Sequence, residues 1–216
     1  MTNAPIPTTA DALTPEWLTN ALGDLLDGAV IDHIDTTMVG TGQMGDSVRL
    51  RLTYDRPTSA PASLVAKLPA ADPTSRATAA AVRSYEIEVS FYRELAPELP
   101  VRNPVCHVAL HDAATDDFIL VLEDLAPAQQ GDQLAGCTPD AAAIAVAELP
   151  KLHAPRWGDP KLTNYPWLSR GDAMSAATLR APPKSRPFHA CNGVCFRCRH
   201  GVSAKCGAPI RAPFKS

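Results

Sequence analysis

Apolar side chains recur at helical spacing near the start of the chain, directly after the pair Thr14-Pro15. A hydroxyl residue followed by proline is typical of a helix N-cap and first turn. The apolar positions that follow are Trp17, Leu18, Ala21, Leu22, Leu25 and Leu26. This spacing predicts a helix, and we expect it to end near Gly28 because glycine favours helix ends.

Five later segments alternate between polar and apolar residues or form short apolar runs, as strands do. They are residues 29–39, 46–54, 62–69, 105–110 and 118–123. The turn at 55–61 contains two prolines and joins the second and third segments as a hairpin. We therefore predict an antiparallel sheet.

Residues 76–96 form a longer periodic segment that predicts one helix between the third and fourth strands. Its apolar arc contains Val82, Tyr85, Val89, Phe91, Tyr92 and Leu95. Glu88 falls inside this arc, whereas Glu86 and Glu94 fall outside it. A carboxylate on a buried face needs a partner because desolvation of a lone charge is costly. The expected partner is Lys67, on the third strand.

A further helix is predicted at 139–153, after the capping residues Thr138-Pro139. Pro150 is expected to kink this helix or to end its regular part. No long periodic segment follows Trp157. Helices and an antiparallel sheet occupy separate stretches of the chain, which places the fold in the α+β class.

Three glycines, Gly40, Gly42 and Gly45, lie between the first two predicted strands. Such a loop lets backbone N–H groups approach phosphates closely, and a strand lysine such as Lys67 supplies a fixed positive charge. A dinucleotide-binding loop would instead lead from a strand into a helix. Because a strand follows here, the sequence favours a hairpin of the kind that covers phosphates in kinases.

The order of these features resembles the small lobe of the protein-kinase-like phosphotransferases. That order is helix, strand, glycine loop, strand, strand with lysine, helix with glutamate, two strands and hinge. The chain is most similar to the aminoglycoside phosphotransferase and choline or ecdysteroid kinase-like group of bacterial phosphotransferases. The resemblance covers roughly residues 12–168 and is carried by residues 39–48, 64–68, 85–96 and 119–125.

The resemblance implies a site for ATP. In this family Gly40, Gly42 and Gly45 would shape the loop over the phosphates. Lys67 would contact the α- and β-phosphates, and Glu88 would orient Lys67 as an ion pair.

At the other end of the implied site, Glu123 and Leu125 would offer backbone groups to the edge of the adenine. The resemblance also implies a division of the chain into four parts. They are an N-terminal helical segment at 1–27, the small lobe at 28–126, the hinge and start of the large lobe at 127–168, and a tail at 169–216.

The residues that hold metal and activate a hydroxyl in this family are missing. The family carries His-x-Asp-x-x-x-x-Asn and then an Asp for magnesium. The pair His111-Asp112 lies between two strands and has no Asn at the required spacing, and Asp172 lacks both the His and the Asn. We therefore assign no catalytic residue and no metal ligand. Mg²⁺ is expected for the family, but this chain should bind ATP weakly and transfer no phosphoryl group.

Composition changes sharply after Asp172. Residues 173–216 carry eight basic and no acidic side chains, which leaves a formal charge of −11 on residues 1–172. Four cysteines also lie there: Cys191, Cys195, Cys198 and Cys206. The tail is either the product of a frameshifted or truncated gene, expected to be disordered, or a zinc-binding segment. Without a complete large lobe, apolar surface on 139–153 should be exposed.

The net charge and the hydropathy of the chain limit which classes of partner and which compartment we expect. The formal net charge of −3 gives no argument for nucleic acid or an anionic membrane. No apolar run reaches the roughly 18 residues that span a bilayer, and the N-terminus lacks a secretory signal, so we expect a cytoplasmic protein.

Three functions remain open at this point. One is an ATP-dependent phosphotransferase for a small-molecule hydroxyl, inactive in this copy. The second is a non-catalytic nucleotide-binding or scaffold protein whose cysteine-rich tail binds zinc or a partner. The third is a plain α+β domain whose glycine loop is accidental.

Overall fold

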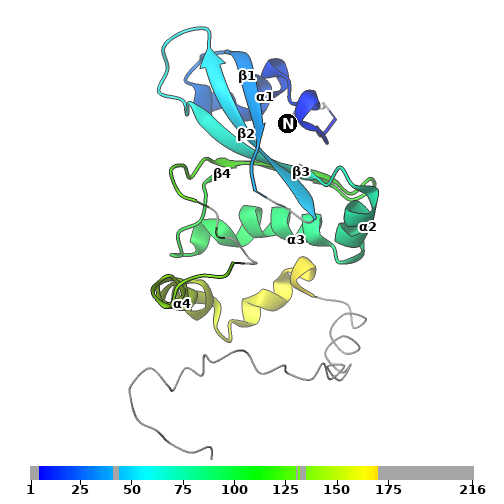
Figure 1. Cartoon of the computed structure of the whole chain (residues 1–216). Helices are drawn as coiled ribbons and strands as arrows, with labels where there is room; N and C mark the ends of the chain where they lie inside the picture. Colours follow the sequence, from blue (N-terminus) through cyan, green and yellow to red (C-terminus); the bar gives the residue numbers. More distant parts are fainter. Residues whose placement is uncertain (1–4, 41–43, 130, 132–134, 170–216) are drawn as a thin grey trace, which may run out of the picture. The chain divides into compact units, whose positions relative to one another are not determined.

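A computed structural model describes residues 5–40, 44–129, 131 and 135–169 (Figure 1). A five-stranded antiparallel sheet with the order β1-β2-β3-β5-β4 organises them. The strands are β1 (Ile31–Met38), β2 (Gly45–Tyr54), β3 (Ser63–Pro69), β4 (Cys106–Asp112) and β5 (Asp117–Glu123). The predicted α+β class and all five strands are confirmed, with strand ends shifted by two residues at most.

The sheet register places alternate residues on two different faces. Ser47 on β2 is opposite Lys67 on β3, and Lys67 is opposite Leu120 on β5, so these three share one face. On β5, Ile119 and Val121 belong to the core on the α1 side, whereas Leu120 belongs to the core beneath α3. Figure 1 shows α1 above the sheet and α3 below it.

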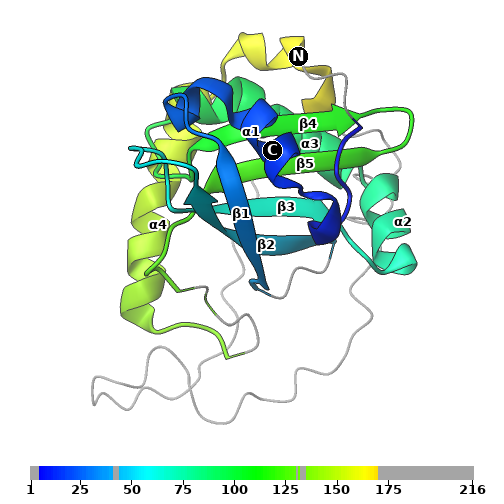
Figure 2. The ribbon, with the colours of Figure 1, turned by 90° about the horizontal axis from the view of Figure 1, so that it is seen from above.

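Helix α1 (Pro15–Leu22) begins as predicted, since the Thr14 hydroxyl accepts a hydrogen bond from the Trp17 N–H at 3.1 Å. Its predicted end was wrong. The α-helix ends at Leu22, and a 3₁₀ turn covers Gly23–Leu26 before Gly28 turns the chain with φ 73°. Residues of α1 share one core with β2, β3 and β5, and Figure 2 shows the helix seen over the strands.

The single helix predicted at 76–96 is wrong. Two helices occupy this region, α2 (Pro73–Ala81) and α3 (Ser84–Ser90), and one π-helical turn, Phe91–Leu95, follows. Arg83 separates them in the left-handed conformation, with φ 55°. Ala79 and Tyr85 are both buried, yet residues six apart lie about 120° apart around a regular helix. The break at Arg83 lets both side chains pack on the sheet.

Helix α4 (Pro139–His153) has the predicted bounds, and the Thr138 hydroxyl accepts from the Ala141 N–H at 3.2 Å. The helix continues through Pro150 to His153, so this proline does not end it. None of its residues is buried, and Ile144 is 69% exposed, which confirms the expected apolar surface.

Short 3₁₀ turns account for the remaining helical residues: Ala10–Ala12, Ala96–Glu98, Ala154–Arg156, Pro160–Asn164 and Pro166–Leu168. None of the helices in the described ranges is both long and apolar enough to cross a membrane. Gly42 and the cysteine-rich tail lie outside the described residues.

Candidate functional site

A cleft of about 730 Å³ opens on the α3 side of β2 and β3. Its lining comes from the glycine loop, β2, β3, α3, Phe118 and Leu122 of β5, and the stretch 123–126, which begins at the last residue of β5 and which we call the hinge-side segment. The cleft falls within the size range of pockets that hold small-molecule ligands and cofactors.

Strand alternation explains why the side chains of β2 and β3 that point away from α1 line the cleft and do not form part of the α1 core. On β2 and β3 the apolar residues Val48, Leu50, Leu64, Ala66 and Leu68 all face the α1 core. The residues between them therefore point to the opposite face, and four of these line the cleft: Ser47, Arg49, Val65 and Lys67. We call these four residues the open face.

Two of the predicted loop glycines have a physical requirement for glycine. Gly40 adopts φ 75°, a conformation that disfavours other residues. A Cβ on Gly45 would lie 3.0 Å from the Leu68 carbonyl oxygen, so a side chain there would require the β3 backbone to give by a few tenths of an ångström. Both glycines line the cleft.

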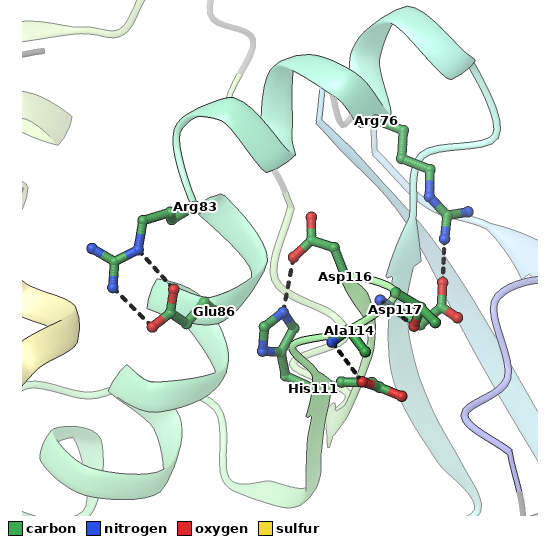
Figure 3. A network of polar contacts seen from close by, with 9 residues as sticks. Arg76, Arg83, Glu86, His111, Ala114, Asp116 and Asp117 are labelled. Carbon is green, nitrogen blue, oxygen red and sulfur yellow. Dashed lines mark hydrogen bonds and ion pairs between the residues drawn. The ribbon is translucent and has the colours of Figure 1, made fainter. Parts of the chain in front are cut away.

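The Lys67 ammonium donates a hydrogen bond to Glu88 Oε1 and forms an ion pair with it. This confirms the predicted choice of Glu88 over Glu86. Glu86 instead accepts two hydrogen bonds from the Arg83 guanidinium, at 2.7 and 2.8 Å (Figure 3). The Lys67 and Glu88 side chains are each 29% exposed, so the pair is more accessible than a buried pair would be.

Two titratable groups near Glu88 are held in their neutral forms. Burial, with a smaller contribution from the Glu88 charge, raises the pKa of Tyr92 to about 12. Burial also raises the pKa of the Cys106 thiol to about 11. The thiolate is the reactive form of cysteine, so Cys106 is inert at neutral pH.

The hinge-side segment brings the two predicted adenine contacts, Glu123 and Leu125, to the wall of the cleft. The Glu123 N–H donates to the Val105 carbonyl at 2.8 Å, so this N–H is not available to a ligand. The Glu123 carboxylate accepts from Arg102 at 2.6 Å and from the Val105 N–H at 3.0 Å, and both bonds lower its pKa. The Leu125 N–H donates to no acceptor within the described part of the chain.

Sequence reasoning missed a cluster that joins β2 to the hinge-side segment. The Asp124 carboxylate accepts from Arg49 Nε at 2.7 Å, Arg49 Nη2 at 3.1 Å, Ser63 Oγ at 2.8 Å and the Ala126 N–H at 3.1 Å. Burial by itself works to raise the pKa of Asp124, but these hydrogen bonds outweigh it and lower the pKa. Only the register, which sets Arg49 beside Val65 and Val65 beside Leu122, could have revealed the contact.

A second polar network surrounds the turn between β4 and β5 (Figure 3). His111 Nε2 lies 2.8 Å from Asp116 Oδ1, and Arg76 of α2 pairs with Asp117. None of these four residues lines the cleft. The pair His111-Asp112, already too early in the sequence for a catalytic loop, thus ends β4 and stabilises the turn before β5, since Asp112 Oδ1 also accepts from the Ala114 N–H at 2.8 Å.

In the ranges that the structure covers, no group of three or more His, Cys, Asp or Glu side chains is arranged to hold a metal ion. The zinc ligands considered for the tail fall outside those ranges. No model of a known protein family matches the chain, and comparison with curated proteins finds no match.

Proposed function

We propose that this chain binds an adenine nucleotide, ATP above all, in the cleft beneath β2 and β3, and that the 216 residues present do not transfer its phosphoryl group. One observation carries the proposal. A single cleft is bordered by a glycine loop, by a lysine–glutamate pair and by a backbone N–H that lacks an acceptor among the described residues. A nucleoside triphosphate requires these features at its phosphate and base ends.

The phosphate end is supported by charge and by close backbone approach. Gly40 and Gly45 lie at the same cleft as Lys67. Glu88 holds the Lys67 side chain in one position, so less rotamer freedom is lost when an anion binds. Lysine acts on phosphate as a compact point charge.

The base end is supported by apolar walls and by the hinge-side segment. Val65 and Leu122 line the cleft and offer apolar surface to a planar ring. The Leu125 N–H is a donor for a ring nitrogen, and the Glu123 carbonyl is an acceptor for an exocyclic amine. This combination fits adenine, whose edge offers an acceptor next to a donor.

The family that the sequence resembles phosphorylates small-molecule hydroxyls with ATP and Mg²⁺. The carboxylates at this cleft do not fit a magnesium site, because each is already paired with a cation. Glu88 pairs with Lys67, Glu123 with Arg102, and Asp124 with Arg49. The sequence supplies no His-x-Asp-x-x-x-x-Asn to activate a hydroxyl.

A chain that binds ATP is expected where ATP is abundant, so we propose that this protein acts in the cytoplasm.

The exposed helix α4 favours a second candidate, a non-catalytic scaffold that binds both nucleotide and another protein. None of its fifteen residues is buried, although Ile144, Val146 and Leu149 are apolar. Apolar surface of this kind marks interaction sites. Tightly bound zinc in the purified full chain, measured by atomic absorption, would support this candidate through its cysteine-rich tail.

Calorimetric titration with ATP tests the first proposal. We expect a Kd on the order of 0.1–1 mM, equivalent to about 4–5.5 kcal/mol. Lys67→Met should weaken binding at least about tenfold, because it removes the only lysine among the described residues that line the cleft. Lys151→Met is the matched control, since Lys151 pairs with Glu148 on α4, away from the cleft. No binding at 5 mM ATP, or equal binding by both variants, would contradict the proposal.

A further inference from the structure

We infer that Asp124 is a positioning residue for the nucleotide base, acting through Arg49 and Ser63 to hold the Leu125 N–H at the cleft. This inference rests on the proposed function, because it names the group that fixes the base end of the same site. Asp124 itself is not expected to touch the phosphates, which lie with Lys67 at the other end of the cleft.

The hydrogen bonds of Asp124 come from three separate parts of the chain. Arg49 belongs to β2, Ser63 begins β3, and Ala126 follows β5. In the sheet, β3 lies between β2 and β5, so the carboxylate joins two strands that are not neighbours. The hinge-side segment is therefore fastened to the strands that form the roof of the cleft.

The strength of this fastening follows from burial and geometry. The Asp124 side chain is only 4% exposed, and Arg49 meets it with two nitrogens at 2.7 and 3.1 Å. Two parallel charge-assisted bonds restrict orientation more than one bond does. A carboxylate this well buried depends most on Arg49, since loss of that guanidinium would leave an uncompensated charge.

The bond from the Ala126 N–H sets the local backbone around Leu125. Asp124 Oδ1 accepts from the residue two positions later, which is an Asx turn. The Leu125 carbonyl then accepts from the Ala128 N–H at 2.9 Å. Both neighbouring groups are occupied, whereas the Leu125 N–H has no acceptor in the parts of the chain described here. The turn thus leaves one donor without an acceptor among the described residues, on a residue that lines the cleft.

Asp55 shows what the same chemistry does away from the cleft. Its carboxylate accepts from the Val30 N–H at 2.8 Å and pairs with Arg56. It supports the turn between β2 and β3 and does not line the cleft. Asp55→Asn is therefore a matched control, because it removes an arginine-paired carboxylate that caps a backbone N–H without touching the base end.

The test compares two ligands, ATP and inorganic triphosphate, by calorimetry on the full chain. Asp124→Asn should weaken ATP binding about five- to tenfold, the value of one lost hydrogen bond, and change triphosphate binding less than about twofold. Ser63→Ala should weaken ATP binding about two- to threefold, and Ser63→Thr, which keeps the hydroxyl, should restore it. Asp55→Asn should alter neither ligand.

Two outcomes would overturn the inference: equal weakening of both ligands by Asp124→Asn, or no change in ATP binding by a folded variant. If Asp124→Asn fails to fold, Ser63→Ala provides the test: a lower ratio of ATP to triphosphate affinity supports the inference, and an unchanged ratio overturns it. A wild-type chain whose ATP binding does not depend on Lys67 would refute the proposed function itself. Lys67-dependent binding with an unchanged affinity ratio would refute only the role of Asp124.

Discussion

The α3 side of the sheet has two halves, one packed against α3 and one lining the cleft. On the β4–β5 half, Phe118 and Leu120 are fully buried against α3. On the β2–β3 half, the open face carries Ser47, Arg49, Val65 and Lys67 at the cleft. Both halves follow the same strand alternation, and Lys67 stands directly opposite Leu120. The β4–β5 half therefore mainly packs the core, although Phe118 and Leu122 also line the cleft, whereas the β2–β3 half carries the polar side chains that can meet a ligand.

The covered half should dominate stability. Phe118→Ala is expected to lower the free energy of unfolding by about 3–5 kcal/mol, because it leaves a cavity in a core. Phe118 is 0% exposed and its ring stacks on Tyr85 with centroids 4.2 Å apart. Urea denaturation measures the change. If Lys67→Met on the open face cost as much, the two halves would not differ in the way described.

Substitution of Gly45, where β2 closely approaches β3, should give the next largest loss in the free energy of unfolding. Gly45→Ala places a Cβ 3.0 Å from the Leu68 carbonyl oxygen, and backbone has to shift to accommodate it. We expect a loss of about 1–3 kcal/mol in the free energy of unfolding, as for other overpacked sites. Gly131→Ala is the control, since a Cβ there meets no atom within 4 Å. Equal thermal midpoints for these two variants would argue against the close approach.

The ion pair beneath the open face should contribute less than the core. Glu88→Ala is expected to cost about 1–2 kcal/mol, between the values for exposed and for buried pairs, because both side chains are 29% exposed. Glu86→Ala, which breaks the more exposed pair with Arg83, should cost less than about 0.5 kcal/mol. Thermal melts of the two variants compare them. Indistinguishable melting shifts would mean that the Lys67–Glu88 pair adds nothing beyond a surface contact.

The smallest stability effect is expected on α4, which contributes no buried residue. Ile144→Ser should change the free energy of unfolding by less than about 0.5 kcal/mol, because the side chain is already 69% exposed. The same change should reduce self-association in sedimentation velocity, since exposed apolar surface drives association. A large loss of stability would show that α4 packs on the rest of the chain.

The sequence predicted the strands well because their alternation is local. The pairing of Lys67 with Glu88 was also predictable, since a carboxylate on a buried helix face requires a cation. The break between α2 and α3 was not, because residues 76–96 keep a helical period and the left-handed residue is Arg83 rather than glycine.

The Asp124 cluster was hidden for a different reason. Arg49 alternates with apolar residues on β2, as a solvent-exposed charge would, and Asp124 lies 75 residues away in sequence. Only the order of the strands and their register bring the two together. Contacts of this kind depend on tertiary structure, so neither periodicity nor a local motif indicates them.

The most direct test of the ligand-binding half is a two-dimensional ¹H–¹⁵N NMR titration of the full chain with ATP. We expect the amide signals of Gly40, Lys67 and Leu125 to shift with a shared Kd on the order of 0.1–1 mM. Signals of the distant turn, His111 and Asp116, should stay unchanged, as should those of α4. Shifts confined to α4 or to the turn, or no shifts at 5 mM ATP, would contradict the claim that the open face binds nucleotide.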